Sequence, residues 1–109
     1  MPDNLSILLE RYRKAIAQIL GEQLNRIILY GSYARGDFQQ DSDIDIMILA
    51  DIDPKEISSY GDKVYDVTYN FEMQYGIEIN PCIQSIQIYE KWKHVYPFFM
   101  NIEKDGVAV

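Results

Sequence analysis

The chain has 109 residues, and its 10 Lys and Arg against 17 Asp and Glu give a net charge of −7. This length is typical of one domain with one modest core, so we expect residues 1–109 to form a single domain without a separate acceptor-binding domain. The acidic balance argues against long DNA or RNA as a ligand, because binding a phosphate backbone requires clustered cations.

Cysteine use and hydropathy indicate the compartment. The one cysteine, Cys82, cannot form an internal disulfide, and the sequence has neither a basic-then-apolar leader nor an apolar run of about 18 residues. We therefore expect a cytoplasmic protein that does not enter a membrane. Cys82 is expected to be a small core residue, and the lone His94 a surface or interface residue.

The first half of the chain predicts one helix and two strands. Residues 4–20 place apolar side chains at helical spacing, with Asp3 as a candidate N-cap and Gly21 as a stop, which indicates an amphipathic helix. The short apolar runs 26–30 and 44–49 are typical of buried strands.

A second long helix follows. Asp53 can cap it, Pro54 takes the first helical position and Glu56 can reach back to the cap. Apolar residues at steps of three and four continue the pattern to about Tyr75, and Gly76 can close the helix in a left-handed conformation.

The last part of the chain predicts one strand and two short helices. Alternation over 77–80 marks a third strand, which Pro81 is expected to limit. Ser85 can cap a helix that runs to about Lys93.

Pro97 then separates a final short helix that Gly106 terminates. The order helix, strand, strand, helix, strand, helix implies an α/β fold of the α+β type, with a small mixed sheet flanked by helices. Four aromatic residues near the end are expected in the core, or in part on a surface for a partner: Trp92, Tyr96, Phe98 and Phe99.

Asp43 and Asp45 are the first candidates for chemistry. They lie two positions apart at the start of a strand, so both point to one face, roughly 6 to 7 Å apart at Cα. Two converging carboxylates repel each other unless a cation lies between them, and Mg²⁺ prefers such hard oxygen ligands together with substrate phosphates. The alternative is an ordinary solvated strand start.

Gly31 and Ser32 lie directly after the first strand. Glycine lets an anion approach the backbone, the Ser32 hydroxyl is a donor, and the following amides can open a short helix that accepts a phosphate. A Gly-Ser pair alone is often a simple turn, and no Gly-Lys-Ser/Thr follows that would make it a P-loop. Combined with two carboxylates on the next strand, it suits two-metal phosphoryl transfer.

The whole stretch is recognisable. Gly-Ser-Tyr-Ala-Arg-Gly at 31–36, followed by Ser-Asp-Ile-Asp at 42–45, resembles the signature of the polymerase-beta-like nucleotidyltransferase superfamily, and specifically of its minimal, antitoxin-type members. The resemblance extends over nearly the whole chain, including the ending Asn101–Val107. It implies the corresponding fold, with ATP as nucleotide donor and Mg²⁺ as cofactor.

The resemblance also implies residue roles. Gly31 and Ser32 would hold the triphosphate, while Asp43 and Asp45 would bind Mg²⁺. The superfamily adds a third acidic residue on a neighbouring strand, which binds a metal and assists deprotonation of the attacking hydroxyl. The candidate here is Glu78, where relatives more often carry Asp; an outward-facing strand residue is the alternative.

Two further residues belong to this candidate site. Arg35 could neutralise developing phosphate charge, or it could pair with Asp37 or Asp41 and stiffen the loop. Ser42 could contact the nucleotide, although bracing of the strand entry is the simpler interpretation.

Three functions compete. By resemblance, the chain transfers AMP from ATP to a tyrosine of a partner HEPN-domain toxin and so neutralises it. A second possibility is a module that blocks such a toxin by contact alone, and a third is transfer to a small molecule such as an aminoglycoside. The sequence leaves open whether the protein forms homo- or hetero-oligomers.

Overall fold

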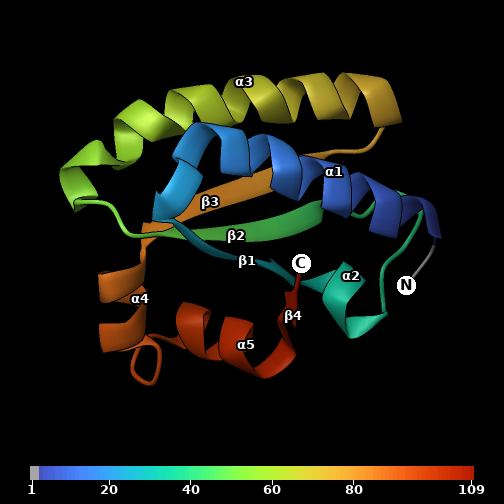
Figure 1. Ribbon diagram of the computed structural model, residues 1–109. Helices are drawn as coiled ribbons and strands as arrows, with labels where there is room; N and C mark the ends of the chain where they lie inside the picture. Colours follow the sequence, from blue (N-terminus) through green and yellow to red (C-terminus); the bar gives the residue numbers. More distant parts are fainter. Residues whose placement is uncertain (1–2) are drawn as a thin grey trace.

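The computed structural model describes residues 3–109 and contains a four-stranded mixed sheet with helices on both faces (Figure 1). The strands lie in the order β3-β2-β1-β4; β1 is antiparallel to β2 and to β4, and β2 is parallel to β3. This confirms the predicted mixed sheet. The strand bounds are Leu24–Tyr30 (β1), Ile44–Ala50 (β2), Ile79–Ser85 (β3) and Val107–Ala108 (β4).

The helices agree closely with the sequence patterns. Short 3₁₀ turns at Gly21–Gln23 and Pro54–Glu56 follow the first helix and precede the third. The side chain of Asp3, the candidate N-cap, lies outside the described part of the chain.

No helix within residues 3–109 has the length and apolar character to cross a membrane. The α-helices are Asp3–Leu20 (α1), Ser32–Arg35 (α2), Ile57–Tyr75 (α3), Ile86–Trp92 (α4) and Pro97–Asp105 (α5).

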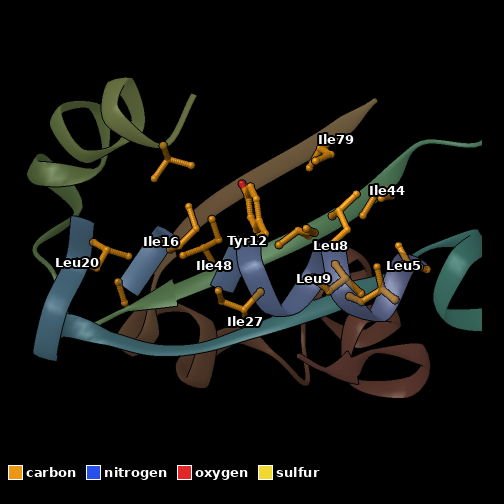
Figure 2. Packing of buried hydrophobic residues seen from close by; sticks show 14 of the residues in the cluster. Leu5, Leu8, Leu9, Tyr12, Ile16, Leu20, Ile27, Ile44, Ile48 and Ile79 are labelled. Carbon is orange, nitrogen blue, oxygen red and sulfur yellow. The ribbon is translucent and has the colours of Figure 1, made fainter. Parts of the chain in front are cut away.

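Helices α1 and α3 cover one face of the sheet. Tyr12 and Ile16 of α1 are fully buried against Ile48 of β2, as Figure 2 shows. The Tyr12 hydroxyl lies 2.7 Å from the hydroxyl of Thr68 on α3, which in turn donates to the carbonyl of Val64. This hydrogen bond joins the two helices inside the larger core cluster.

Helices α4 and α5 cover part of the opposite face. Met47 of β2 is fully buried there beside Tyr89 of α4 and Phe99 of α5. Because β2 is covered on both faces, all its residues except Asp45 are buried, which explains its nearly continuous apolar run. The expected aromatic core is divided, since Tyr96 and Phe98 remain 47 % and 46 % exposed.

The start and end of the third helix form as predicted. The Asp53 side chain accepts from the backbone N–H of Lys55 at 2.9 Å, and Glu56 accepts from the N–H of Asp53 at 3.2 Å, which completes the capping box. The 3₁₀ turn there leads directly into α3. Gly76 ends α3 with φ of 66°, the left-handed conformation that glycine favours.

The predicted bounds of the third strand were wrong. The strand begins at Ile79 and continues through Pro81 to Ser85, instead of covering 77–80 and stopping at Pro81. The backbone carbonyl of Glu78 accepts a hydrogen bond from the N–H of Ile44 on β2. Every second residue of β3 then faces β2 in the same way, so the nitrogen of Pro81 points away from β2. Since β3 is an edge strand, proline costs it no ladder hydrogen bond.

Candidate functional site

Polar residues gather where β1 ends and β2 and β3 begin. In the sheet register Asp45 lies between Tyr30 of β1 and Asn80 of β3, and Asp43 precedes β2 by one residue. Residues at these positions share the face that carries Met47, the face that α4 and α5 cover farther along the sheet. The predicted common face of the two aspartates is therefore observed.

Asn80 joins the two aspartates. Its Nδ2 donates to Oδ2 of Asp43 at 3.2 Å and to Oδ1 of Asp45 at 3.4 Å. Both carboxylates thus converge on one position, which the NH₂ group of Asn80 occupies. Flipping the amide presents its carbonyl oxygen to the same point, because the two ends of an asparagine side chain are nearly isosteric.

Gly31 gives the Asp45 carboxylate its space. Gly31 has φ of 76° and ψ of −156°, a region essentially restricted to glycine. A Cβ on this residue would lie 3.2 Å from Cγ of Asp45 and would overlap Oδ2 of the same side chain. The turn after β1 therefore has two independent requirements for glycine.

The short helix α2 begins at Ser32, as predicted. The N–H of Gly36 donates to the carbonyl of Ser32 at 2.9 Å, and the N–H of Arg35 donates to the carbonyl of Gly31 at 3.1 Å. The first amides of a helix have no acceptor within it, so the N–H groups at the start of α2 can serve an anion. Ser32 is half-buried and follows directly the glycine that contacts Asp45.

The loop after α2 is braced by its own residues. Arg35 is exposed, and its Nε lies 3.3 Å from Oδ2 of Asp37, which matches the pairing alternative for this residue. The Ser42 hydroxyl accepts from the N–H of Gln39 at 2.7 Å, and the Ser42 N–H donates to the carbonyl of Gln39 at 3.1 Å. These contacts give Ser42 the role of a loop brace at the entrance to β2.

Glu78 lies one residue before β3 and is exposed. A hydrogen bond with Asp43, and then the negative charge of Asp43, raise the pKa of the Glu78 carboxyl above its ordinary value. The side chain of Glu78 is therefore in contact with that of Asp43. Within residues 3–109, however, no three His, Cys, Asp or Glu side chains form a group that could hold a metal ion.

An aromatic pair borders the carboxylates on the same face. Burial raises the pKa of the Tyr30 hydroxyl to about 12, and the charge of nearby Asp45 adds to the effect. Phe98 of α5 and Tyr30 form a T-shaped pair, with ring centroids 5.7 Å apart and an angle of 80° between the rings.

The remaining candidates take the places expected for them. Cys82 is half-buried against the smaller core cluster, where burial raises the pKa of its thiol, and His94 is exposed.

Sequence reasoning missed Asn80. The alternation of Ile77-Glu78-Ile79-Asn80 puts residues 78 and 80 on one face, but an asparagine is not the third acid that the resemblance implies. Cross-strand register makes Asn80 the direct neighbour of Asp45, whereas Glu78 reaches Asp43 from just outside the strand.

The donor set suits a hard divalent cation. Two carboxylates from one strand entry converge, the amide of Asn80 lies beside both, and Glu78 lies beside Asp43. Oxygen ligands of this kind fit Mg²⁺, which commonly takes one or two carboxylates and completes its shell with water and phosphate. Asp43 and Asp45 would hold the ion, and the start of α2 lies beside them to receive the phosphates.

Comparison with known proteins agrees with this geometry. The family model for a nucleotidyltransferase domain matches residues 9–99. Two proteins of Methanocaldococcus jannaschii, provisionally named protein adenylyltransferases, are similar to this chain. One is 37 % identical over 84 residues, covering 77 % of this chain and 76 % of that protein. The other is 36 % identical over 104 residues, covering 94 % and 95 %.

Solved structures share the fold. A protein of Sulfolobus solfataricus, described as a nucleotidyltransferase, aligns over 93 % of this chain and 75 % of its own with a TM-score of 0.63 and 19 % identity. A toxin–antitoxin with AMP-PNP aligns over 91 % of this chain and 70 % of its own, with a TM-score of 0.54 and 16 % identity. At these identities the likeness is one of fold.

Proposed function

This chain belongs to the nucleotidyltransferase domain family, and we propose that residues 1–109 act as one domain that transfers AMP from ATP to a tyrosine hydroxyl of a partner HEPN-domain toxin. The observation that carries the proposal is the convergence of Asp43 and Asp45 beside the Gly31-Ser32 turn. This arrangement places carboxylates for a metal next to backbone donors for phosphates.

Each side of the site has a proposed task. Ser32 and the first amides of α2 bind the triphosphate, and Gly31 lets it approach the backbone. Asp43 and Asp45 hold Mg²⁺, which when bound supplies Lewis acidity and in-line alignment of the phosphates. The flexible end of Arg35 can leave Asp37 and turn to the phosphates, since this exposed pair contributes little stability.

Glu78 has the proposed task of taking the proton from the attacking hydroxyl. A carboxylate whose pKa is raised is a stronger base than an ordinary glutamate, and Asp43 has this effect on Glu78. The hydroxyl oxygen then bonds to the α-phosphorus, the bond to the bridging oxygen breaks, and pyrophosphate leaves. Glu78 lies just before β3, the edge strand of the sheet, and is exposed.

Two relationships support a protein acceptor and a toxin partner. The relatives that match most of this chain are named for transfer of adenylyl groups to proteins. One structural neighbour is the toxin–antitoxin MntA-HpeT, solved as a variant in which two aspartates, two positions apart, are changed to glutamate. Asp43 and Asp45 have the same spacing in this chain.

The proposal is tested with the protein, its cognate partner, Mg²⁺ and ATP labelled at the α-phosphate. We expect label on a tyrosine of the partner, a mass increase of one AMP, and loss of both in the Asp43→Asn/Asp45→Asn variant. Asp41→Asn is the matched control, because Asp41 is an exposed loop acid two residues before Asp43. Label on a small-molecule acceptor but not on the partner would contradict the proposal.

A contact inhibitor is the second candidate function. The observation that favours it is Asn80, a neutral amide where a carboxylate would complete a cluster of three with Asp43 and Asp45. Neutralisation of the partner that survives the Asp43→Asn/Asp45→Asn change would establish this alternative. Neutralisation that disappears together with transfer would exclude it.

A further inference from the structure

Phe98 is an aromatic residue that helix packing leaves half uncovered. Its neighbours on α5, Phe99 and Ile102, are buried in the smaller core cluster, whereas Phe98 is 46 % exposed. The Phe98 ring meets Phe99 at a centroid distance of 5.8 Å and Tyr30 at 5.7 Å, with an angle of 80° to the Tyr30 ring. The ring therefore contacts two aromatic neighbours, and part of it faces solvent.

Phe98 lies on the same face of the sheet as the carboxylates. Tyr30 is the direct cross-strand partner of Asp45, and the side chains of such a pair project to one face. The sequence of contacts Asp45, Tyr30, Phe98 thus runs from the proposed metal ligands to α5 without crossing the sheet. Gly31, which opens the phosphate turn, directly follows Tyr30 in the chain.

From these contacts, and resting on the nucleotide binding proposed above, we propose that Phe98, which packs against Tyr30, is the surface on which the nucleobase of the bound nucleotide stacks. A nucleotide has a polyanionic end and a flat aromatic end. The turn at Gly31-Ser32 suits the first, and the exposed Phe98 ring on the carboxylate face suits the second.

Stacking on Phe98 should discriminate little between nucleobases. Phe98 has no hydrogen-bonding group, and the Tyr30 hydroxyl beside it is the polar atom of the pair. Stacking tolerates any base because every base has a π-face. ATP and GTP should therefore depend on Phe98 to a similar extent.

Another half-exposed phenyl ring provides the control. Phe38, 38 % exposed, stacks on Tyr33 at a centroid distance of 4.5 Å, close in sequence to the same turn. Tyr33 packs against the core cluster under α1 and α3, on the opposite face of the sheet from Asp45. Truncation of Phe38 thus removes a ring of the same size and similar exposure from the wrong face.

The test measures binding by isothermal titration calorimetry with Mg²⁺ and either ATP, GTP or inorganic tripolyphosphate, which has no base. We expect Phe98→Ala to weaken ATP and GTP binding by about 5- to 100-fold and to leave tripolyphosphate binding unchanged. Phe98→Trp should retain ATP affinity, and Phe38→Ala should leave all three affinities unchanged.

The outcomes separate this inference from the proposed function. Unchanged ATP affinity in Phe98→Ala, or a loss equal for ATP and tripolyphosphate, overturns the stacking role while nucleotide binding stands. A selective loss of ATP affinity in Phe38→Ala moves the base to the other face and also overturns it. If the unaltered protein binds neither ATP nor tripolyphosphate, the proposed function itself fails.

Discussion

The carboxylate of Asp45 occupies the space that a side chain on Gly31 would take. A Cβ on Gly31 would lie 3.2 Å from Cγ of Asp45, and the backbone there has φ of 76°. Because Gly31 directly follows β1 and Asp45 belongs to β2, this contact joins the phosphate turn to the proposed metal ligands. The position of the Asp45 carboxylate thus depends on the absence of a side chain on Gly31.

Gly31→Ala should therefore damage the site more than the fold. Both Gly31 and Gly36 have positive φ, 76° and 83°. Alanine at Gly36 should lower the free energy of unfolding by about 1–2 kcal/mol, and alanine at Gly31 should lower it more, because its φ and ψ are confined to glycine and a Cβ overlaps Asp45. Nothing lies within 4 Å of a Cβ on Gly36. We expect Gly31→Ala alone to reduce nucleotidyl transfer by about 10- to 100-fold, because it displaces Asp45. Equal activity of the two variants, measured beside urea unfolding, would refute the coupling.

Asn80→Asp should make stability depend on divalent cations. A third carboxylate beside Asp43 and Asp45 adds repulsion where an amide now donates at 3.2 and 3.4 Å. We expect Tm in EDTA to fall by about 4–8 °C, which corresponds to about 1 kcal/mol in a domain of this size. Added Mg²⁺ should restore more of Tm in this variant than in the unaltered protein, because bound metal relieves the repulsion. Asn80→Ala, which removes the donor without adding charge, is the control.

Glu78→Gln should separate catalysis from binding. If Glu78 accepts the proton of the attacking hydroxyl, Glu78→Gln should lower the rate of nucleotidyl transfer by about 100-fold and leave the ATP affinity unchanged. A loss of ATP affinity as large as the loss of transfer would instead assign Glu78 to metal binding. Glu22→Gln, an exposed acid in the turn after α1, controls for net charge.

Local patterns predicted those parts of the site that depend on local geometry. The two-residue period of a strand was enough to place Asp43 and Asp45 on one face, and Gly31 at the end of a strand was enough to predict a tight turn. The helix caps at Asp53 and Ser85 were also predictable, since each cap acts on an N–H within three residues.

Features set by strand order were not predictable in this way. Pro81 stops a strand or continues it depending on whether its nitrogen faces a neighbour, and only the edge position of β3 decides that. The two-residue strand β4 exists because it pairs with Ile28 and Leu29 of β1, far away in sequence. The contact of Asn80 with both aspartates likewise follows from the register of β3 against β2.

The buried hydroxyl of Tyr12 should contribute to the loss of stability at alkaline pH. Burial raises the pKa of Tyr12 from 10.0 to about 12, partly offset by its hydrogen bond with Thr68. The folded state holds this proton more tightly than the unfolded state, so the stabilising contribution is complete below pH 10 and is lost as pH rises to about 12. A shift of this size corresponds to about 3 kcal/mol.

Tyr12→Phe is the matched variant for this effect. It keeps the ring among α1, α3 and the sheet but removes the hydroxyl that lies 2.7 Å from Thr68, which should cost about 1 kcal/mol at neutral pH. Between pH 10 and 12 the unaltered protein should lose about 2 kcal/mol more of its free energy of unfolding than the variant does. Urea unfolding at a series of pH values measures both. Parallel loss in the two proteins would mean that ionisation of other tyrosines, and not of Tyr12, governs alkaline unfolding.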